Sequence, residues 1–270
     1  MIEQLGEGFP VVCHHGSPST ARLYARWRTD GVRLIGFDRS GYRDAPRRRG
    51  RSVADVVDEV VAVVDSLGIE RFATWGISGG GPHALACAAL LPDRVVAAAA
   101  IGSPAPFDAE GLDWYAGFGA GNVIEFGAAE RGEVAVRPML EQEHAARAAG
   151  GVAALRDGLS TLLGGADAEM LDGPFVEYLY ELMTATDGVD GWVDDDLAFV
   201  RPWGFELGSI QVPVLIRHGE QDRFVPPAHA RWLAEHTPGA EVEITAGDGH
   251  LTLYENGIAG VHSWMLRNVH

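Results

Sequence analysis

The sequence of 270 residues contains no lysine, and its 21 basic residues are all arginines. It has only two cysteines, Cys13 and Cys87, which are far apart and have neither a CxxC partner nor a histidine-rich neighbourhood. Such cysteines argue against a metal site or a disulfide framework, and we expect both to be small buried side chains. No run of about 18 apolar residues occurs, so no transmembrane helix is predicted.

Positive charge is also scarce. The formal net charge is −17, which disfavours nucleic acid and anionic membranes as partners and leaves a small-molecule substrate as the expected one. The start of the chain carries Glu3 and Glu7 and lacks the basic and then apolar layout of a signal peptide. We therefore expect a cytoplasmic protein, and nothing in the sequence indicates its oligomeric state.

Short β-like runs alternate with helical runs, a pattern typical of an α/β fold with a mostly parallel sheet flanked by helices. Several of these runs are apolar throughout, as expected when helices cover both faces of a strand. Strands are predicted at 11–15, 32–38, 72–77, 95–102, 214–219 and 241–245. A helix is predicted over 52–67, with Ser52 and Asp55 as a capping box, and another over 80–91.

The alternation stops between about Pro104 and Pro213, where only helical patterns occur, separated by glycines. Helices are predicted at 122–131, 133–149, 152–163, 175–186 and 191–200. We interpret residues 105–210 as an all-helical cap inserted into a core formed by residues 1–104 and 211–270. The cap carries 20 acidic residues against 5 arginines, and therefore −15 of the net charge. We expect these acids to lie on exposed helix faces, where they favour solubility. The alternative is that the acidic cap receives a cationic substrate, such as the free amino group of a peptide.

Gly76-Ile77-Ser78-Gly79-Gly80 lies between an apolar strand and an alanine-rich helix. This pattern predicts a sharp turn that lifts the Ser78 hydroxyl clear of the sheet, with glycines where a side chain would collide with neighbouring backbone. A serine hydroxyl is a poor nucleophile at neutral pH, so it needs a base, an orienting acid and donors for an oxyanion.

Candidates for each of these roles follow other strands. His250 follows the last predicted strand and is the candidate base, and Asp222 follows the strand before it and is the candidate acid. Glu220 is the nearest rival of Asp222 for the role of the acid. The order Ser78, Asp222, His250 is the one expected with this type of turn. A turn at His15-Gly16-Ser17-Pro18 would aim the Ser17 N–H at the same space as the N–H of Gly79, giving two oxyanion donors.

At these segments the chain resembles the α/β-hydrolase superfamily. His15 to Pro18 is similar to its HGxP turn, Asp38 to Tyr42 to its DxxGxG-like loop, and Gly76 to Gly80 to its nucleophile turn. Gly219 to Pro226 and Gly249-His250 are similar to its acid and histidine loops. The resemblance covers nearly the whole chain and implies a triad of Ser78, Asp222 and His250, with Ser17 and Gly79 as oxyanion donors.

The chain departs from the family pattern at two places. Arg43 stands where the loop after Tyr42 often has glycine. The family also usually has a β-hairpin before the strand that leads to His15, whereas here a fragment at residues 2–5 is all that is expected. Either the sheet is short at that edge or the true start lies upstream.

A serine at this turn favours acyl transfer, without a cofactor, from a small ester, thioester or amide or from an activated C–C bond. The triad also serves peracid-forming and cyanohydrin-cleaving relatives, which the sequence does not exclude. Two rivals remain: an aminopeptidase of the proline-iminopeptidase type, which normally has tryptophan after the serine, and a non-catalytic receptor on the same fold. Arginines at 43–51 are expected on a solvated face, with attraction of an anionic substrate as the alternative. Six aromatic residues are candidates for an apolar pocket: Trp114, Tyr115, Phe118, Phe126, Trp192 and Trp203.

Overall fold

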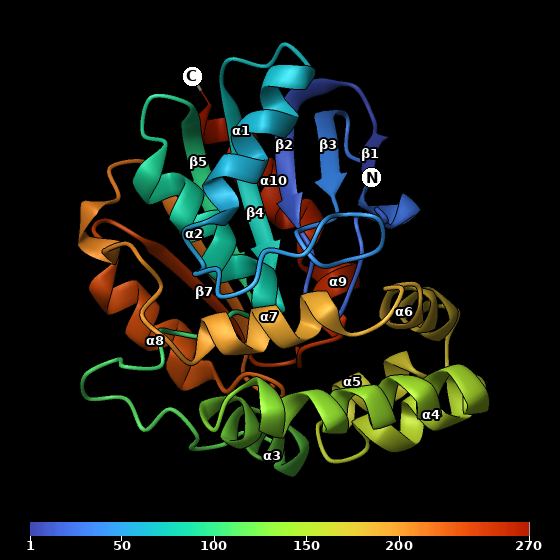
Figure 1. The fold of residues 1–270 in the computed structure, drawn as a ribbon. Helices are drawn as coiled ribbons and strands as arrows, with labels where there is room; N and C mark the ends of the chain where they lie inside the picture. The colour runs from blue at the N-terminus through green and yellow to red at the C-terminus, as the bar shows by residue number, and fades with distance from the viewer. Residues whose placement is uncertain (270) are drawn as a thin grey trace.

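Seven strands form one sheet in the order β1-β3-β2-β4-β5-β6-β7 in the computed structural model, which describes residues 1–269 (Figure 1). Every neighbouring pair is parallel except β1 and β3. The strands are β1 Ile2–Leu5, β2 Gly8–His14, β3 Gly31–Phe37, β4 Phe72–Ile77, β5 Val95–Ile101, β6 Val214–Gly219 and β7 Glu241–Thr245. The six predicted strands and the predicted α/β fold are thus confirmed.

The edge of the sheet at β1 is short. Its four residues pair with β3 in antiparallel register, with Ile2 opposite Phe37 and Leu5 opposite Leu34. The predicted fragment at residues 2–5 is therefore a strand, and it covers the edge of β3. Arg43, in the loop after β3, takes the left-handed backbone conformation (φ 52°) that usually favours glycine.

Helices cover both faces of the sheet because its strands are apolar on both sides. On one face lie α1 (Val56–Ser66), α2 (Gly81–Leu90) and α8 (Pro227–His236), which share a buried core with Val12 and Ile35. On the other, α10 (Ile258–Asn268) packs against Val11 and Trp75, next to the short helix α9 (Thr252–Asn256).

Helix α1 begins four residues later than the predicted start at Ser52. The Asp55 carboxylate accepts hydrogen bonds from both the N–H and the hydroxyl of Ser52, at 2.7 and 2.9 Å. The capping-box prediction is therefore wrong: these bonds close a turn ahead of the helix, which begins at Val56 without a side-chain cap. Gly68, with φ 67°, follows the end of the helix in the left-handed conformation that glycine favours.

All helices between β5 and β6 lie in the segment predicted to form a cap. They are α3 Ala120–Glu130, α4 Glu133–Leu159, α5 Gly165–Met170, α6 Phe175–Thr184 and α7 Asp190–Phe199. Two predicted helices are merged into α4 across a kink at Gly151, whose φ is 63°, and α5 was not predicted. Figure 1 shows α7 crossing below the carboxyl ends of the strands, with α3 and α4 beyond it. We call residues 105–210 the helical insertion.

Candidate active site

Ser78 occupies a strained turn at the end of β4. Its φ of 55° lies in the left-handed region that residues other than glycine seldom adopt. A Cβ at Gly76 would lie 2.0 Å from the carbonyl oxygen of Gly80, and one at Gly80 would lie 2.1 Å from that of His14. The glycines therefore allow the close approach of backbone that this turn requires, as the sequence predicted.

His250 and Asp222 meet in the loops that follow β7 and β6. The imidazole Nδ1 of His250 lies 2.7 Å from Oδ2 of Asp222. The other oxygen of Asp222 accepts the backbone N–H groups of Phe224 and Val225, each at 2.8 Å, and thereby fixes the carboxylate. The Phe224 ring stacks on the imidazole at 4.7 Å between centroids.

The surroundings of His250 change its pKa in opposite directions. Burial lowers it, whereas the charge and hydrogen bond of Asp222 and the charge of Asp167 raise it, and the net pKa of His250 is raised. The rival acid, Glu220, forms an ion pair with Arg231 at 2.7 Å, and both side chains are about half exposed. Asp222 is therefore the carboxylate that contacts the imidazole.

Asp167 is a site residue that the sequence did not reveal. It comes from α5 in the helical insertion and accepts the backbone N–H groups of His250, Leu251 and Thr252 at 2.8, 2.7 and 3.2 Å. A Cβ at Gly249 would lie 2.4 Å from its carboxylate, so that glycine is needed there. The insertion thus fixes the loop that carries His250.

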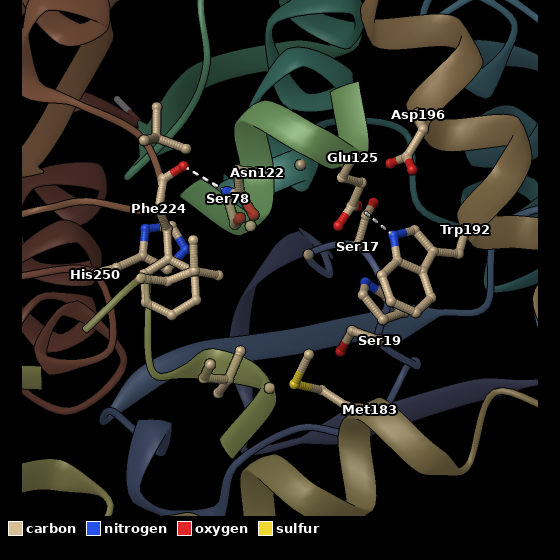
Figure 2. Close-up of a pocket in the computed structure, with 18 of the residues that line it drawn as sticks. Ser17, Ser19, Ser78, Asn122, Glu125, Met183, Trp192, Asp196, Phe224 and His250 are labelled. Carbon is tan, nitrogen blue, oxygen red and sulfur yellow. Dashed lines mark hydrogen bonds between the residues drawn. The ribbon is translucent and has the colours of Figure 1, made fainter. Parts of the chain in front are cut away.

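Ser78 and His250 line the same cavity, which has a volume of about 250 Å³. Among residues 1–269, no hydrogen bond joins the Ser78 hydroxyl directly to the imidazole. Figure 2 shows Ser78, His250 and Phe224 toward one side of the cavity, and Glu125, Trp192 and Asp196 toward the other. Most of the remaining wall is apolar, including Leu159, Leu179 and Met183.

Ser17 and Gly79 both lie on the wall of this cavity. Gly79 is second in the turn Ser78–Gly80, so its N–H is one of the donors without a partner inside the turn. The Arg39 guanidinium donates to the carbonyl oxygens of His15 and Gly16, at 2.6 and 3.2 Å, and so fixes the turn before Ser17. The Ser17 hydroxyl donates to Asp195, which leaves the Ser17 backbone N–H as the candidate oxyanion donor.

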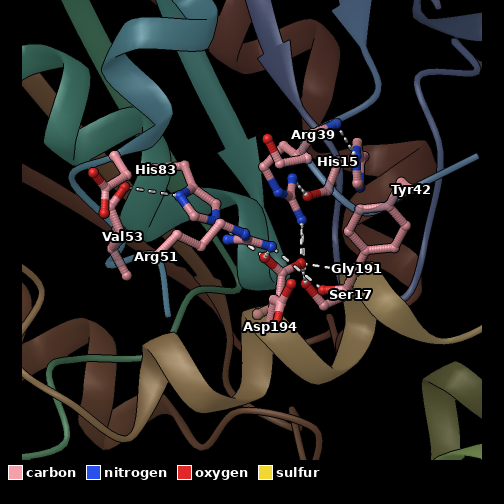
Figure 3. A network of polar contacts seen from close by, with 12 residues as sticks. His15, Ser17, Arg39, Tyr42, Arg51, Val53, His83, Gly191 and Asp194 are labelled. Carbon is pink, nitrogen blue, oxygen red and sulfur yellow. Dashed lines mark hydrogen bonds and ion pairs between the residues drawn. The ribbon is translucent and has the colours of Figure 1, made fainter. Parts of the chain in front are cut away.

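Asp195 of α7 is the centre of a buried network that connects the helical insertion to the core. It contacts Arg39 at 2.6 Å, Arg51 at 2.5 Å and the Tyr42 hydroxyl at 2.7 Å. Figure 3 shows the side chains of Arg39, Tyr42, Arg51 and Ser17 converging from the core side. Burial raises the pKa of Asp195, but the charges of Arg39 and Arg51 outweigh it and hold the pKa well below its usual value.

This network corrects two sequence-based expectations. The arginine loop was expected on a solvated face, yet the Arg51 side chain is buried, and Arg47 pairs with Asp194 at 2.7 Å. The acids of the insertion were expected on exposed faces, yet Asp194, Asp195 and Asp196 are all buried. Buried opposite charges pair at Arg51 with Asp195, and Arg47 pairs with Asp194, whereas other members of both segments are exposed as expected, among them Arg48, Arg49 and Glu177.

The aromatic residues of the insertion fall into two groups. Phe118, Phe126 and Trp192 line the cavity, as predicted. Trp114 and Tyr115 do not; Trp114 packs in a cluster with Phe118 and Phe126, at 5.0 Å between centroids in each pair. Trp203 also lies away from the cavity, in the core beneath α1. The prediction is therefore wrong for half of the six, because aromatic residues also serve as ordinary core.

Two features of the described residues bear on other classes of function. Within residues 1–269, no group of three or more histidine, cysteine or acidic side chains is arranged to hold a metal ion. None of the helices in that range combines the length and apolar character needed to cross a membrane. Both cysteines are buried and unpaired, as predicted.

The chain has relatives among characterised proteins. It is 26% identical over 273 residues to a 2-hydroxymuconate semialdehyde hydrolase of Pseudomonas putida, an alignment that covers 94% of this chain and 85% of the relative. The fold is similar to that of a thermophilic esterase from Thermogutta terrifontis, with a TM-score of 0.73 at 20% identity over 100% of this chain and 93% of the other. It is also similar to an enol-lactonase from Burkholderia xenovorans, with a TM-score of 0.68 at 19% identity over 98% and 94%.

The two solved structures, each under 25% identical, show a shared fold. The family model described as the alpha/beta hydrolase fold matches residues 10–257, which is nearly the full length and includes the segments of Ser17, Ser78, Asp222 and His250. The chain belongs to the alpha/beta hydrolase fold family.

Proposed function

We propose that this protein is a serine hydrolase that cleaves a small ester, thioester or amide through an acyl-Ser78 intermediate. One observation carries the proposal: Ser78, held in a left-handed turn, lines the same cavity as an imidazole already paired with Asp222. Membership of a hydrolase family agrees with it.

The proposed reaction begins with attack of Ser78 Oγ on the carbonyl carbon. His250 takes the hydroxyl proton at Nε2, because its Nδ1 is engaged by Asp222. The tetrahedral oxyanion accepts hydrogen bonds from the N–H groups of Ser17 and Gly79. The bond to the leaving group breaks as His250 returns its proton to that group, and water, deprotonated by His250, then releases the acyl group from Ser78.

The free site is not yet aligned for the first proton transfer, since no direct hydrogen bond joins Ser78 to His250. Such bonds are often long or poorly aligned without substrate and tighten in the complex. Each oxyanion donor in enzymes of this kind contributes about 3 kcal/mol to transition-state stabilisation. We propose that the helical insertion acts as a cap that excludes water from this site.

The cavity favours a small acyl group because its volume is about 250 Å³ and its wall is mostly apolar. 2-Hydroxymuconate semialdehyde is a second candidate substrate, since a relative named for its hydrolysis aligns over 94% of the chain. The iminopeptidase alternative is disfavoured at Gly79, where even a Cβ would lie 2.7 Å from Ser17 Oγ and 2.9 Å from Phe199.

The test is turnover of a panel of p-nitrophenyl esters, thioesters, aminoacyl p-nitroanilides and 2-hydroxymuconate semialdehyde, with Ser78→Ala as the blank. Asp222→Asn should reduce kcat about 10⁴-fold with folding intact, because the imidazole would lose its orientation and its correct tautomer. Glu220→Gln is the matched control and should retain activity. Equal activity of Ser78→Ala and wild type would refute the proposal, and no turnover of any substrate would favour the receptor alternative.

A further inference from the structure

Two carboxyl groups face each other on the cavity wall away from Ser78. Glu125 comes from α3 and Asp196 from α7, and both line the cavity (Figure 2). Glu125 accepts a hydrogen bond from the Trp192 indole at 2.8 Å. Asp196 is 1% exposed, and its Oδ2 has no hydrogen-bond partner among residues 1–269. A buried carboxylate oxygen without a partner is costly, and a ligand that donates to it would remove that cost.

The cations near Glu125 and Asp196 are engaged by other side chains. Arg147 of α4 lies nearby, but its Nη2 contacts Glu143, and its guanidinium lies 4.9 Å above the Trp192 ring. The neighbouring acids on α7 have their own partners, since Asp194 binds Arg47 and Asp195 binds Arg39 and Arg51. Within the described residues, neither Glu125 nor Asp196 forms an ion pair.

A bound proton, in place of a cation, neutralises part of the negative charge of Glu125 and Asp196. Burial, with the nearby charge of Glu143, raises the pKa of Glu125 to about 7. Burial and the charge of Glu125 raise the pKa of Asp196 well above its usual value. The pair therefore holds a proton near neutral pH, because the carboxylate of buried Asp196 and that of half-buried Glu125 repel each other. A bound cation would take the place of that proton.

We propose that Glu125 and Asp196 form a subsite for a primary ammonium group carried on the acyl part of the substrate. The position of this subsite relative to the bond that is cleaved rests on the proposed function of Ser78. A primary ammonium has three N–H donors for the two carboxyl groups, and the mostly apolar wall of the cavity suits a hydrocarbon spacer. A quaternary ammonium fits less well, because Arg147 already covers a face of Trp192.

An anionic substrate group is the opposing possibility. Arg147 Nε and Nη1 are also buried without partners in the described part of the chain. Glu143 forms an ion pair with this guanidinium, and the carboxyl groups of Glu125 and Asp196 line the same cavity. An entering carboxylate would meet their negative charge, so the surroundings favour a cation.

Matched esters test the inference. The probes are p-nitrophenyl 4-(aminomethyl)benzoate, its neutral analogue p-nitrophenyl 4-ethylbenzoate and the anionic p-nitrophenyl 4-(carboxymethyl)benzoate. We expect kcat/KM of the ammonium ester to exceed that of the neutral ester by about 10-fold to 100-fold, the range for a hydrogen bond to a charged group. The difference should lie mainly in KM, because the ammonium group is remote from the reacting atoms.

The ratio of the two kcat/KM values also has a predicted pH dependence. Below pH about 7 the proton held by Glu125 must leave before the ammonium binds, so the preference should shrink as the pH falls. Titration of His250 affects both esters alike and cancels in the ratio. The other charges facing the pair, those of Glu143, Arg147 and Asp195, are already in ion pairs.

Substitutions test whether the ammonium preference depends on Glu125 and Asp196. Glu125→Gln and Asp196→Asn should each remove most of the ammonium preference, measured as the ratio of kcat/KM for the ammonium ester to kcat/KM for the neutral ester. Glu177→Gln, an exposed acid on α6, is the control for total charge and should keep the preference. Far-UV circular dichroism and thermal melting check that each variant folds.

Binding gives a readout that does not need turnover. Titration calorimetry of Ser78→Ala with 4-(aminomethyl)benzamide, in two buffers of different ionisation enthalpy, should show proton release at pH 6 that Glu125→Gln abolishes. Hydrolysis of the neutral ester with no ammonium preference and no binding of the amine would overturn this inference and leave the proposed function standing. Preference for the anionic ester, lost in Arg147→Gln, would also overturn it. Amine binding with proton release but no ester hydrolysis would support the subsite and refute the proposed function.

Discussion

Asp195 and Asp196 are adjacent on α7 and both are buried, yet their surroundings are opposite. Asp195 faces the core, where Arg39, Arg51 and Tyr42 saturate it and its pKa is well below the usual value. Asp196 faces the cavity, where its nearest titratable neighbour is another acid and its pKa is well above the usual value. The first therefore holds the insertion on the core, and the second is left available to a ligand.

The difference shows that burial alone does not determine what a carboxyl group does. Successive residues on a helix point about 100° apart, so one short acidic run can serve two separate environments. Removing a carboxylate that neutralises two buried guanidinium groups is costly, because their charges are left uncompensated. A carboxylate that repels a second carboxylate is itself kept at a cost. Residues kept at such a cost are candidates for function.

The largest expected effect on stability is that of Asp195→Asn. It leaves the buried guanidinium groups of Arg39 and Arg51 without their counter-charge, which should lower the free energy of unfolding by about 3–5 kcal/mol. Asp196→Asn is the matched control and should be neutral or stabilising, because it removes a carboxyl that is held with a raised pKa. Equilibrium unfolding in urea measures both, and equal losses in the two variants would break the comparison.

The next effect is a pH dependence of stability that Glu125 creates. Its pKa is about 7 in the folded chain against an ordinary 4.5, so the folded state binds more protons than the unfolded state between these values. Stability contributed by this group is therefore present below pH about 4.5 and falls as the pH rises to about 7. The full change is on the order of 3 kcal/mol.

Glu125→Gln should flatten this part of the stability profile, and Glu177→Gln should not. Urea unfolding at a series of pH values between 4.5 and 8 measures the slope. Wild type and Glu125→Gln with the same slope over this window would show that Glu125 titrates normally.

The smallest effect is expected for Asp167. Its environment is intermediate between those of Asp195 and Asp196, because its partners are backbone N–H groups. Asp167→Asn keeps an acceptor oxygen for the His250 loop but removes a charge that raises the pKa of His250. The histidine must be neutral to act as a base, so the acid limb of the kcat/KM profile should move to lower pH. A pH–rate series on one p-nitrophenyl ester measures this; an unmoved limb would mean that Asp167 only supports the loop.

The sequence was sufficient to predict structural features that depend mainly on residues close together in the chain. Short apolar runs predicted the strands. The glycines flanking Ser78 predicted the turn, because a side chain at those positions would collide with neighbouring backbone. The pairing of His250 with Asp222 was also expected, because parallel strands bring their carboxyl ends to one edge of the sheet.

The sequence was insufficient where burial depends on contacts between distant segments. The arginine loop and the acids of α7 are about 150 residues apart, and each has the composition of a solvated surface. Only their mutual pairing, such as Arg51 with Asp195, allows both to be buried. Asp167 was missed because it lies in α5, a six-residue helix without a strong apolar pattern, and its partners are backbone groups of a remote loop.

The central claim is that Ser78 is the nucleophile of a site completed by His250 and Asp222. Labelling with a fluorophosphonate, followed by digestion and peptide mass spectrometry, tests it most directly. We predict one covalent adduct, on Ser78, that is absent from Ser78→Ala and formed far more slowly by His250→Ala. An adduct on another residue, or a folded wild-type protein that forms none, would contradict the claim.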